Sequence, residues 1–173
     1  MTGRNPVKIY SPPDTPKTAQ QSRIEEVANE SETRFRLVAD TAPVLIWMSG
    51  VDKLCTYFNK PWLDFTGRSL EQELGNGWAE GVHPDDLQRS LNTYTQSFER
   101  REKFRMEYRL RRHAREYRWI LDIGVPRFNQ DRSFAGYIGI AVDVTERKTA
   151  EDELLPLLFL TTIASGGLSS WRN

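Results

Sequence analysis

Few side chains in this sequence are of the types that catalyse reactions or bind metals, and those few are scattered. The only histidines are His83 and His113, and the only cysteine is Cys55. A metal site needs several convergent His, Cys or carboxylate ligands, and one cysteine cannot form an internal disulfide. The neighbouring carboxylates Asp85 and Asp86 directly follow a proline, a pattern typical of the start of a helix. These residues predict neither a metal site nor a catalytic centre.

Sequence motifs of the common enzyme mechanisms are also absent. There is no glycine-rich phosphate loop, no G-x-S-x-G and no pair of histidines at metal-binding spacing. Neither a phosphorylatable histidine in a helical hairpin nor an ATP-binding domain follows Lys148. Cys55 lies in a stretch that predicts a strand, where a buried cysteine acts as a small apolar residue. We therefore expect a protein that acts by binding and is not an enzyme by itself.

The segment 136–148 joins a predicted strand to a predicted helix. An apolar run over 137–142 is followed by a polar cluster that contains Asp143, Thr145, Glu146 and Arg147. Asp143 and Glu146 have the spacing of a reciprocal N-terminal cap. Asp143 and Arg147 are four residues apart, so they could also pair. We expect these four residues to form a rigid junction that relays a change in the sheet to the outgoing helix.

Large aromatic residues are unusually frequent for a chain of this size. They could fill an ordinary core, or they could line an apolar ligand pocket. The sequence leaves both explanations open. The pocket candidates are Trp47, Tyr57, Trp62, Phe65, Trp78, Leu87, Leu91, Met106, Tyr108 and Trp119.

Composition excludes several classes of protein. Lys plus Arg and Asp plus Glu each number 24, so the formal net charge is zero and no broad positive field favours nucleic acid. No apolar run approaches the ~20 residues that a membrane helix needs. The first residues lack the apolar core of a secretory signal. We expect a cytoplasmic protein with no transmembrane segment and no nucleic-acid partner.

The order of predicted elements indicates one α+β domain with flanks. Residues 1–20 are proline-rich and polar, which predicts a disordered leader, and 21–41 predicts an amphipathic helix. Residues 42–148 contain two strands, a helical middle and three more strands, the order of an antiparallel sheet. Residues 149–173 predict a short helix and an irregular apolar tail. Within the domain, Leu87, Leu91, Tyr94 and Phe98 give the helix 85–101 one apolar stripe.

Several blocks of sequence, whose order and spacing also match, resemble the PAS family of sensor domains. Residues 143–148 (D-V-T-E-R-K) resemble the family's C-terminal PAC motif, as found in bacterial sensor histidine kinases. Residues 31–47, 57–67 and 82–86 resemble its opening, its N-x-x-W…F-T-G helix and the lead-in to its long helix. The resemblance covers roughly residues 30–150. It implies a five-stranded antiparallel sheet with a helical clamp on one face, flanked by N- and C-terminal helices.

The resemblance also implies that the core could hold a ligand or cofactor, whose identity the sequence leaves unknown. Some PAS domains bind haem through a histidine on the long helix, but the helix 85–101 contains none. Light-sensing PAS domains bind flavin with an N-C-R-F-L-Q motif, which is absent. Haem and flavin are therefore both disfavoured.

Three functional hypotheses follow from the resemblance. The first is a sensory module of bacterial signal transduction that binds a small ligand or a partner chain and relays the change through the last strand. The second is the truncated sensory part of a two-component sensor histidine kinase, with the enzyme absent from this chain. The third is a ligand-free dimerisation module, a homodimer formed through the flanking helices.

Overall fold

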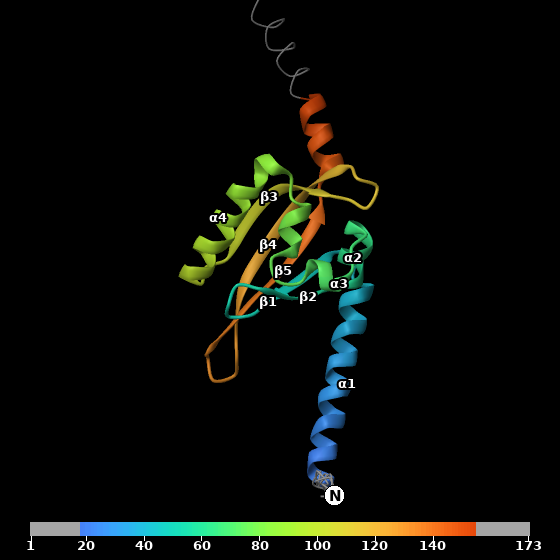
Figure 1. Ribbon diagram of the computed structural model, residues 1–173, viewed down its shortest axis with the longest axis vertical. Coiled ribbons are helices and arrows are strands. Elements are labelled where there is room, and N and C mark those ends of the chain that lie inside the picture. The colour runs from blue at the N-terminus through green and yellow to red at the C-terminus, as the bar shows by residue number, and fades with distance from the viewer. Residues whose placement is uncertain (1–17, 155–173) are drawn as a thin grey trace, which may run out of the picture. The chain divides into compact units, whose positions relative to one another are not determined.

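The computed structural model describes residues 18–154 of the chain (Figure 1). The leader expected over 1–20 and the tail expected over 149–173 lie largely outside the described residues. The chain divides into two units, Met1–Leu37 and Val38–Asn173, and each is described by itself. No described helix is long and apolar enough to cross a membrane.

The part of the first unit that the structure describes contains helix α1 (Ala19–Thr41), whose last residues belong to the second unit. It begins with a reciprocal cap, because the Thr18 hydroxyl accepts from the Gln21 backbone and the Gln21 side chain accepts from the Thr18 backbone. Exposed ion pairs such as Arg36–Glu32, at 2.8 Å, connect successive turns and stabilise an isolated helix only slightly. The helix spans the segment 21–41 and begins two residues before it.

The second unit contains the predicted five-stranded antiparallel sheet. Its strands are β1 (Leu45–Ser49), β2 (Cys55–Phe58), β3 (Phe104–Arg111), β4 (Tyr117–Phe128) and β5 (Phe134–Asp143). The spatial order is β2-β1-β5-β4-β3. The last strand therefore lies at the centre of the sheet, between the first strand and β4 (Figure 1).

Three short helical segments and one long helix cover one face of this sheet (Figure 1). They are α2 (Lys60–Thr66), α3 (Leu70–Glu73), the 3-10 helix η1 (Gly77–Gly81) and α4 (Pro84–Arg100). The buried side chain of Asn59 caps α2 by accepting from the Trp62 backbone, at 3.2 Å. It also accepts from Ile46 and donates to Ala39 and Val44, so one amide fixes α2 against β1.

The start of α4 is attached to the edge strand β3 by a buried carboxylate. His83 caps the helix, its Nδ1 accepting from the Asp85 backbone at 3.2 Å. Asp86 accepts from the Arg109 side chain at 2.8 Å and from the Arg109 backbone at 3.0 Å. The hydrogen bond from Arg109 lowers the pKa of Asp86 to about 2. Asp85 and Asp86 are placed favourably for the helix dipole, and Asp86 in addition attaches α4 to the sheet.

Two glycines shape the inner face of the sheet, the face toward the helices. Gly124 of β4 and Gly139 of β5 are register partners. The Phe104 ring lies over Gly124, where a Cβ would be 2.3 Å from its Cε1, and the Trp47 ring lies 2.2 Å from a Cβ at Gly139. The two rings stack at 6.1 Å between centroids. The glycines therefore form a shallow trough that lets two aromatic rings lie close to the backbone.

The opposite, outer face carries most of the apolar side chains of β4 and β5. On β4 the residues toward the helices are Ile120, Asp122 and Gly124. The alternating apolar residues of the same strand lie on the outer face: Tyr117, Trp119, Leu121, Ile123 and Val125. The strand continues through Pro126 and has a register irregularity at Arg127 and Phe128.

Substitution of Gly124 by alanine tests the trough. We expect Gly124→Ala to lower the free energy of unfolding by about 1–3 kcal/mol, because the new methyl group overlaps the Phe104 ring. In a Phe104→Leu background the same substitution should cost less, since the ring that it meets is gone. Denaturant unfolding of the four proteins of this cycle measures the coupling. Equal costs in both backgrounds would contradict the proposed overlap.

Candidate functional site

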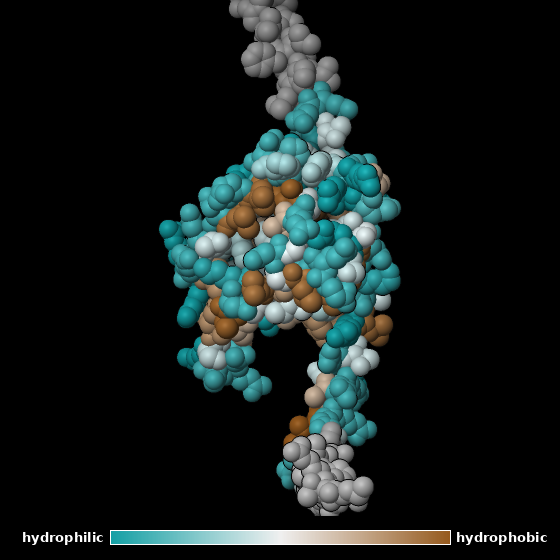
Figure 2. Space-filling model, in the orientation of Figure 1, coloured by the Kyte–Doolittle hydropathy of each residue, from teal (hydrophilic) through white to brown (hydrophobic). Residues whose placement is uncertain are grey.

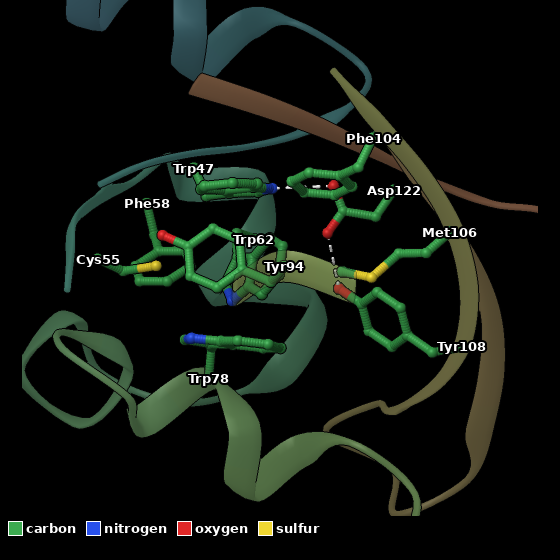
Figure 3. Close-up of a pocket in the computed structure, with 10 residues that line it drawn as sticks. All are labelled: Trp47, Cys55, Phe58, Trp62, Trp78, Tyr94, Phe104, Met106, Tyr108 and Asp122. Carbon is green, nitrogen blue, oxygen red and sulfur yellow. Dashed lines mark hydrogen bonds between the residues drawn. The ribbon is translucent and has the colours of Figure 1, made fainter. Parts of the chain in front are cut away.

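The inner face of the sheet and its helices enclose a small aromatic cavity (Figure 3). Its volume is about 10 Å³, roughly the space that one water molecule needs. Ten side chains line it: Trp47, Cys55, Phe58, Trp62, Trp78, Tyr94, Phe104, Met106, Tyr108 and Asp122. They come from β1, β2, β3, β4, α2, η1 and α4, so every layer of the domain contributes to this one chamber.

Asp122 is the charged side chain of the cavity lining, and it is 3% exposed. Trp47 Nε1 donates to one carboxyl oxygen at 3.0 Å, and the Tyr108 hydroxyl bonds the other at 3.1 Å (Figure 3). Burial raises the pKa of Asp122 to about 7, although both hydrogen bonds oppose that rise. No cation balances the charge among these contacts, so the group is poised to gain or lose a proton near neutral pH.

Trp78 closes the cavity from the side of η1 and brings a second polar group. Its indole nitrogen is buried and has no hydrogen-bond partner among the described residues. A buried donor without an acceptor costs free energy, and such groups often mark a ligand or water site. The backbone at Gly77 lies so close to that of Gln72 that a Cβ on residue 77 would be 1.9 Å from the Gln72 carbonyl oxygen. The segment that carries Trp78 is thus fixed tightly at one point.

A buried ion pair between Arg68 and Glu73 stabilises the segment that runs from the end of α2 to η1. Glu73 is 1% exposed, and its carboxylate lies 2.9 Å from the Arg68 guanidinium. Arg68 also donates to the carbonyl oxygens of Gln72 and Gly77. Burial raises the pKa of Glu73, against the opposing effects of Trp62 and Arg68. This pair connects α3 to η1 and so positions the wall that contains Trp78.

The cysteine behaves as an apolar residue of the cavity wall. Cys55 is buried on β2, and burial, with the nearby Asp122 and Glu73 carboxyls, raises the pKa of its thiol. A thiol held in its protonated form is a poor nucleophile and a poor metal ligand. Across residues 18–154, no three His, Cys, Asp or Glu side chains gather in a way that could hold a metal ion.

The structure brings together five of the ten residues that the sequence suggested for a pocket: Trp47, Trp62, Trp78, Met106 and Tyr108. Phe65, Leu87 and Leu91 instead pack against the edge of the core. Tyr57 is half-buried on β2, beside the cavity-lining Phe58. Trp119 lies on the outer face of the sheet, where Arg109 and Lys148 stand over its ring at 5.4 and 5.2 Å.

Sequence reasoning missed the polar centre of the cavity. The sequence predicts Cys55 as a structural residue only, and the predicted pocket does not include Phe58, Tyr94, Phe104 or Asp122. A signal for Asp122 does exist in the sequence. It is a lone acid between Ile120 and Gly124, at alternate positions of a strand whose other face is wholly apolar.

The predicted junction after β5 is held by hydrogen bonds within itself and to the neighbouring strand β4. The Asp143 carboxylate accepts from the Thr145 backbone at 2.9 Å and from the Arg118 guanidinium at 2.8 Å. The Thr145 hydroxyl accepts from the Trp119 backbone at 2.8 Å. Burial raises the pKa of Asp143, but the bonds from Thr145 and Arg118 outweigh it, and the pKa lies below its usual value.

Helix 145–154 begins one residue later than the sequence indicated. The first helical bond runs from Lys148 to the Val144 carbonyl oxygen, at 3.0 Å, so Val144 and not Asp143 is the N-cap. Asp143 pairs with Arg118, not with Arg147 as its spacing had suggested. Glu146 is exposed. In place of the reciprocal cap expected between Asp143 and Glu146, the Asp143 carboxylate accepts hydrogen bonds from Thr145 and from Arg118 of the neighbouring strand β4.

The first turn of this helix is also bound to the edge strand β3. Glu107 accepts from Arg147 at 2.9 Å and pairs with Lys148 at 2.6 Å. The hydrogen bond from Lys148 is the main cause that holds the pKa of Glu107 below its usual value. Arg147 makes a further pair with Glu151, one turn along the helix, at 2.5 Å. The helix thus starts against β3 and β4 on the outer face of the sheet.

Cavity and junction are connected through a short stretch of β4. Both backbone groups of Trp119 bind the junction, the N–H to Thr145 and the carbonyl oxygen to the Val144 N–H at 2.8 Å. Asp122 is three residues further along the same strand, and Ile120 between them pairs with Asp143 of β5. The backbone of β4 thus joins the Asp122 side of the cavity to the residues that start the helix.

Comparison with known families identifies this architecture. A family model described as the PAS fold matches residues 56–141. The protein contains a PAS domain. The match includes eight of the ten residues that line the cavity, all except Trp47 and Cys55, and it ends on β5, two residues before Asp143.

Relatives of the PAS domain occur in sensor proteins of signal transduction. The chain is 48% identical over 130 residues to the uncharacterized protein y4lL of Sinorhizobium fredii, which covers 75% of this chain and 16% of that protein. It is 28% identical over 134 residues to the peroxide stress-activated histidine kinase mak1 of Schizosaccharomyces pombe, covering 72% of this chain and 8% of the kinase. The chain therefore spans a small part of the length of the curated relatives that it matches.

A solved structure supports the same assignment. The sensory box histidine kinase/response regulator of Burkholderia thailandensis superimposes with a TM-score of 0.55 at 28% identity, covering 75% of this chain and 98% of that one. Together with the family match, this confirms the PAS resemblance and the expected fold. The PAS domain is related to the sensor domains of histidine kinases.

The raised pKa of Asp122 predicts how the stability of the PAS domain depends on pH. Between the usual carboxyl pKa and about 7, folded Asp122 holds a proton that the unfolded chain has released. Its contribution to the free energy of unfolding is therefore largest in acid and falls as the pH rises through that range, by an amount on the order of a few kcal/mol.

Asp122→Asn keeps the shape and both hydrogen-bond positions but cannot ionise. We expect the variant to lose this pH dependence and to gain stability relative to the native chain at about pH 8. Denaturant unfolding of both proteins at about pH 5 and about pH 8 gives the difference, in which the shared effects of Glu73, Asp86 and Asp143 cancel. Parallel pH profiles would show that Asp122 does not titrate in this range.

Proposed function

We propose that this PAS domain is a sensory module that binds a small ligand in the cavity around Asp122. Binding would change the contacts of Asp122 with Trp47 and Tyr108, and β4 would pass the change to helix 145–154. The observation that carries this proposal is the position of Trp119, whose backbone binds the junction three residues from Asp122. A two-state element biased by differential contacts is sufficient for such signalling.

The chemistry of the cavity limits the class of ligand. Its walls are aromatic, and their polar groups include the Asp122 carboxyl and the indole N–H of Trp78, which has no hydrogen-bond partner among the described residues. A fitting ligand has an apolar body, an acceptor for Trp78 and a donor for Asp122. Because the cavity is only about 10 Å³, a ligand larger than a water molecule must displace part of the wall. A rotation of the Trp78 side chain would do this without breaking a hydrogen bond and without moving the fixed backbone of η1.

A cavity-filling substitution at Cys55 tests ligand binding. Cys55→Val adds apolar volume to the wall, and we expect it to leave the free energy of unfolding unchanged or higher. Small neutral aromatic compounds with one hydrogen-bonding group should raise the melting temperature of the native chain, as binding to the folded state requires. The same compounds should have no effect on the variant. Equal shifts in both proteins would place binding elsewhere, and no shift with any compound would argue against a ligand.

Removal of the Thr145 hydroxyl tests the junction. Thr145→Val keeps the side-chain shape but leaves the Trp119 N–H without its acceptor, which should cost about 1–3 kcal/mol where that group is shielded from water. We expect faster hydrogen exchange at the amides of Trp119 and Lys148. Thr149→Val is the matched control, since its hydroxyl bonds only the carbonyl oxygen one turn earlier in the helix. Similar exchange in both variants would remove the Trp119–Thr145 bond from the relay.

Dimerisation through the N-terminal helix is a second candidate function, favoured by the exposed apolar residues of α1. Ile24 and Val27 lie three residues apart on one face of the helix and are 63% and 61% exposed within their own unit. Helices of this kind usually gain their stability by packing an apolar face. We propose a second copy of α1 as the partner.

Sedimentation of the full chain tests this pairing. The double substitution Ile24→Ser and Val27→Ser should weaken self-association by at least about tenfold if each side chain loses about 1 kcal/mol of burial. Glu26→Ser, on the opposite side of the helix, should leave it unchanged. A native chain that sediments as a monomer at all concentrations would exclude this function.

The output of the sensor is proposed from the relatives alone. Histidine kinases named among them suggest that the shift at helix 145–154 controls a kinase in a two-component system. The PAS domain would act there as the sensory part, without catalytic residues of its own.

A further inference from the structure

A second, strongly basic cleft lies on the surface of the PAS domain, away from the aromatic cavity. It is an open cleft of about 470 Å³ between the end of α2 and the turn that joins β3 to β4. In Figure 1 that turn, drawn in yellow, lies beside α2. Five of the side chains that line it are basic: Arg68, Arg111, Arg112, His113 and Arg115. A cleft of this size is in the range of small-molecule sites.

The positive charge of the basic cleft is only partly neutralised. Arg68 pairs with Glu73 and Glu80, and Arg112 pairs with Glu116 at 3.3 Å. Neither Arg111 nor Arg115 forms an ion pair with any residue that the structure describes. Two guanidinium groups therefore face one cleft without a counter-charge, while the whole chain has a formal net charge of zero.

The basic cleft is held in place by backbone contacts. The His113 N–H donates to the Phe65 carbonyl oxygen at 2.9 Å, and the Arg112 N–H donates to Glu116 at 2.8 Å. His113 also packs on the C-cap of α2, where a Cβ on Gly67 would lie 2.4 Å from the His113 Cβ. The turn is thus fixed against α2, which keeps the two unpaired arginines on one preorganised wall.

We propose that the basic cleft binds a small phosphorylated ligand, with its phosphate between Arg111 and Arg115. The planar guanidinium group matches phosphate oxygens in pairs of hydrogen bonds, and a phosphate ester carries enough charge for two of them. Tyr117 lines the same cleft with a ring that is 39% exposed, so it offers an apolar surface to the rest of the ligand. The volume accommodates a molecule of the size of a nucleoside monophosphate. This site is separate from the proposed sensory cavity.

The backbone offers an unusually clean way to test the basic cleft. Arg115 has a φ of 67°, in the left-handed region that favours glycine. Arg115→Gly therefore removes the charge without straining the fold. Arg132, in the turn between β4 and β5, has a φ of 66° and does not line the cleft. Arg132→Gly is a matched control that changes the net charge and the backbone in the same way.

Titration of the full chain with AMP, followed by calorimetry and by amide chemical shifts, measures binding. We expect AMP to bind and to shift the amides of residues 111–117, adenosine not to bind, and inorganic phosphate to displace AMP. Arg115→Gly should weaken the affinity about tenfold through the loss of a charged hydrogen bond. Arg132→Gly and Asp122→Asn should leave it within about twofold, and the latter result separates this site from the sensory cavity.

Three results would overturn the proposal. They are the absence of AMP-induced shifts in residues 111–117, binding of adenosine as tight as that of AMP, and equal weakening by Arg115→Gly and Arg132→Gly. The second result would assign recognition to the base, and the third would reduce it to net charge.

Discussion

One carboxyl group inside an aromatic chamber constrains the whole PAS domain. Asp122 can be buried on β4 only because Trp47 of β1 and Tyr108 of β3 supply a hydrogen bond to each of its oxygens. These three strands are not consecutive in the sheet, since β5 lies between β1 and β4. The network therefore fixes side chains across the sheet. Removing one partner would leave a buried polar group unsatisfied, which is costly in a medium of low dielectric.

Two acids on neighbouring strands, Asp122 and Asp143, have pKa values shifted in opposite directions, and each has a different role in the proposed sensor. Burial raises the pKa of Asp122 to about 7, whereas bonds from Thr145 and Arg118 hold the pKa of Asp143 below its usual value. The first group can change its protonation or its partners near neutral pH. The second stays ionised and keeps the junction closed. The proposed relay needs both: Asp122 changes its state, and Asp143 keeps the start of the helix attached to the sheet.

The sequence predicted the parts of this fold that depend on local pattern. The apolar stripe of α4 and the strand before Asp143 both correspond to observed elements. The order of blocks gave the PAS resemblance, which the family match and the solved structures confirm. Local periodicity was sufficient there because each element buries one face.

The candidate site depends on contacts between distant residues, and these were harder to foresee. Asp122 bonds Trp47 across 75 positions of sequence, and Asp143 finds Arg118 across 25. The spacing of Asp143, Glu146 and Arg147 suggests pairs within the helix. In the structure, Asp143 instead pairs with Arg118 of β4, which the spacing along the chain does not reveal. Likewise, the pocket candidate Trp119 belongs to the apolar alternation of β4, which lies on the face away from the cavity. Only the pairing of Gly124 with Gly139 makes room for aromatic rings on the other face.

The coupling between Asp122 and the outgoing helix is the central claim, and an NMR titration of the full chain tests it most directly. The Asp122 carboxyl carbon and the amides of Trp119, Val144 and Lys148 should shift with one common midpoint near pH 7, and the same amides should not shift in Asp122→Asn. The amide of Arg132, in the distant β4–β5 turn, should be unaffected in both proteins. A carboxyl that titrates near its usual pKa, or junction amides that ignore its titration, would contradict the account.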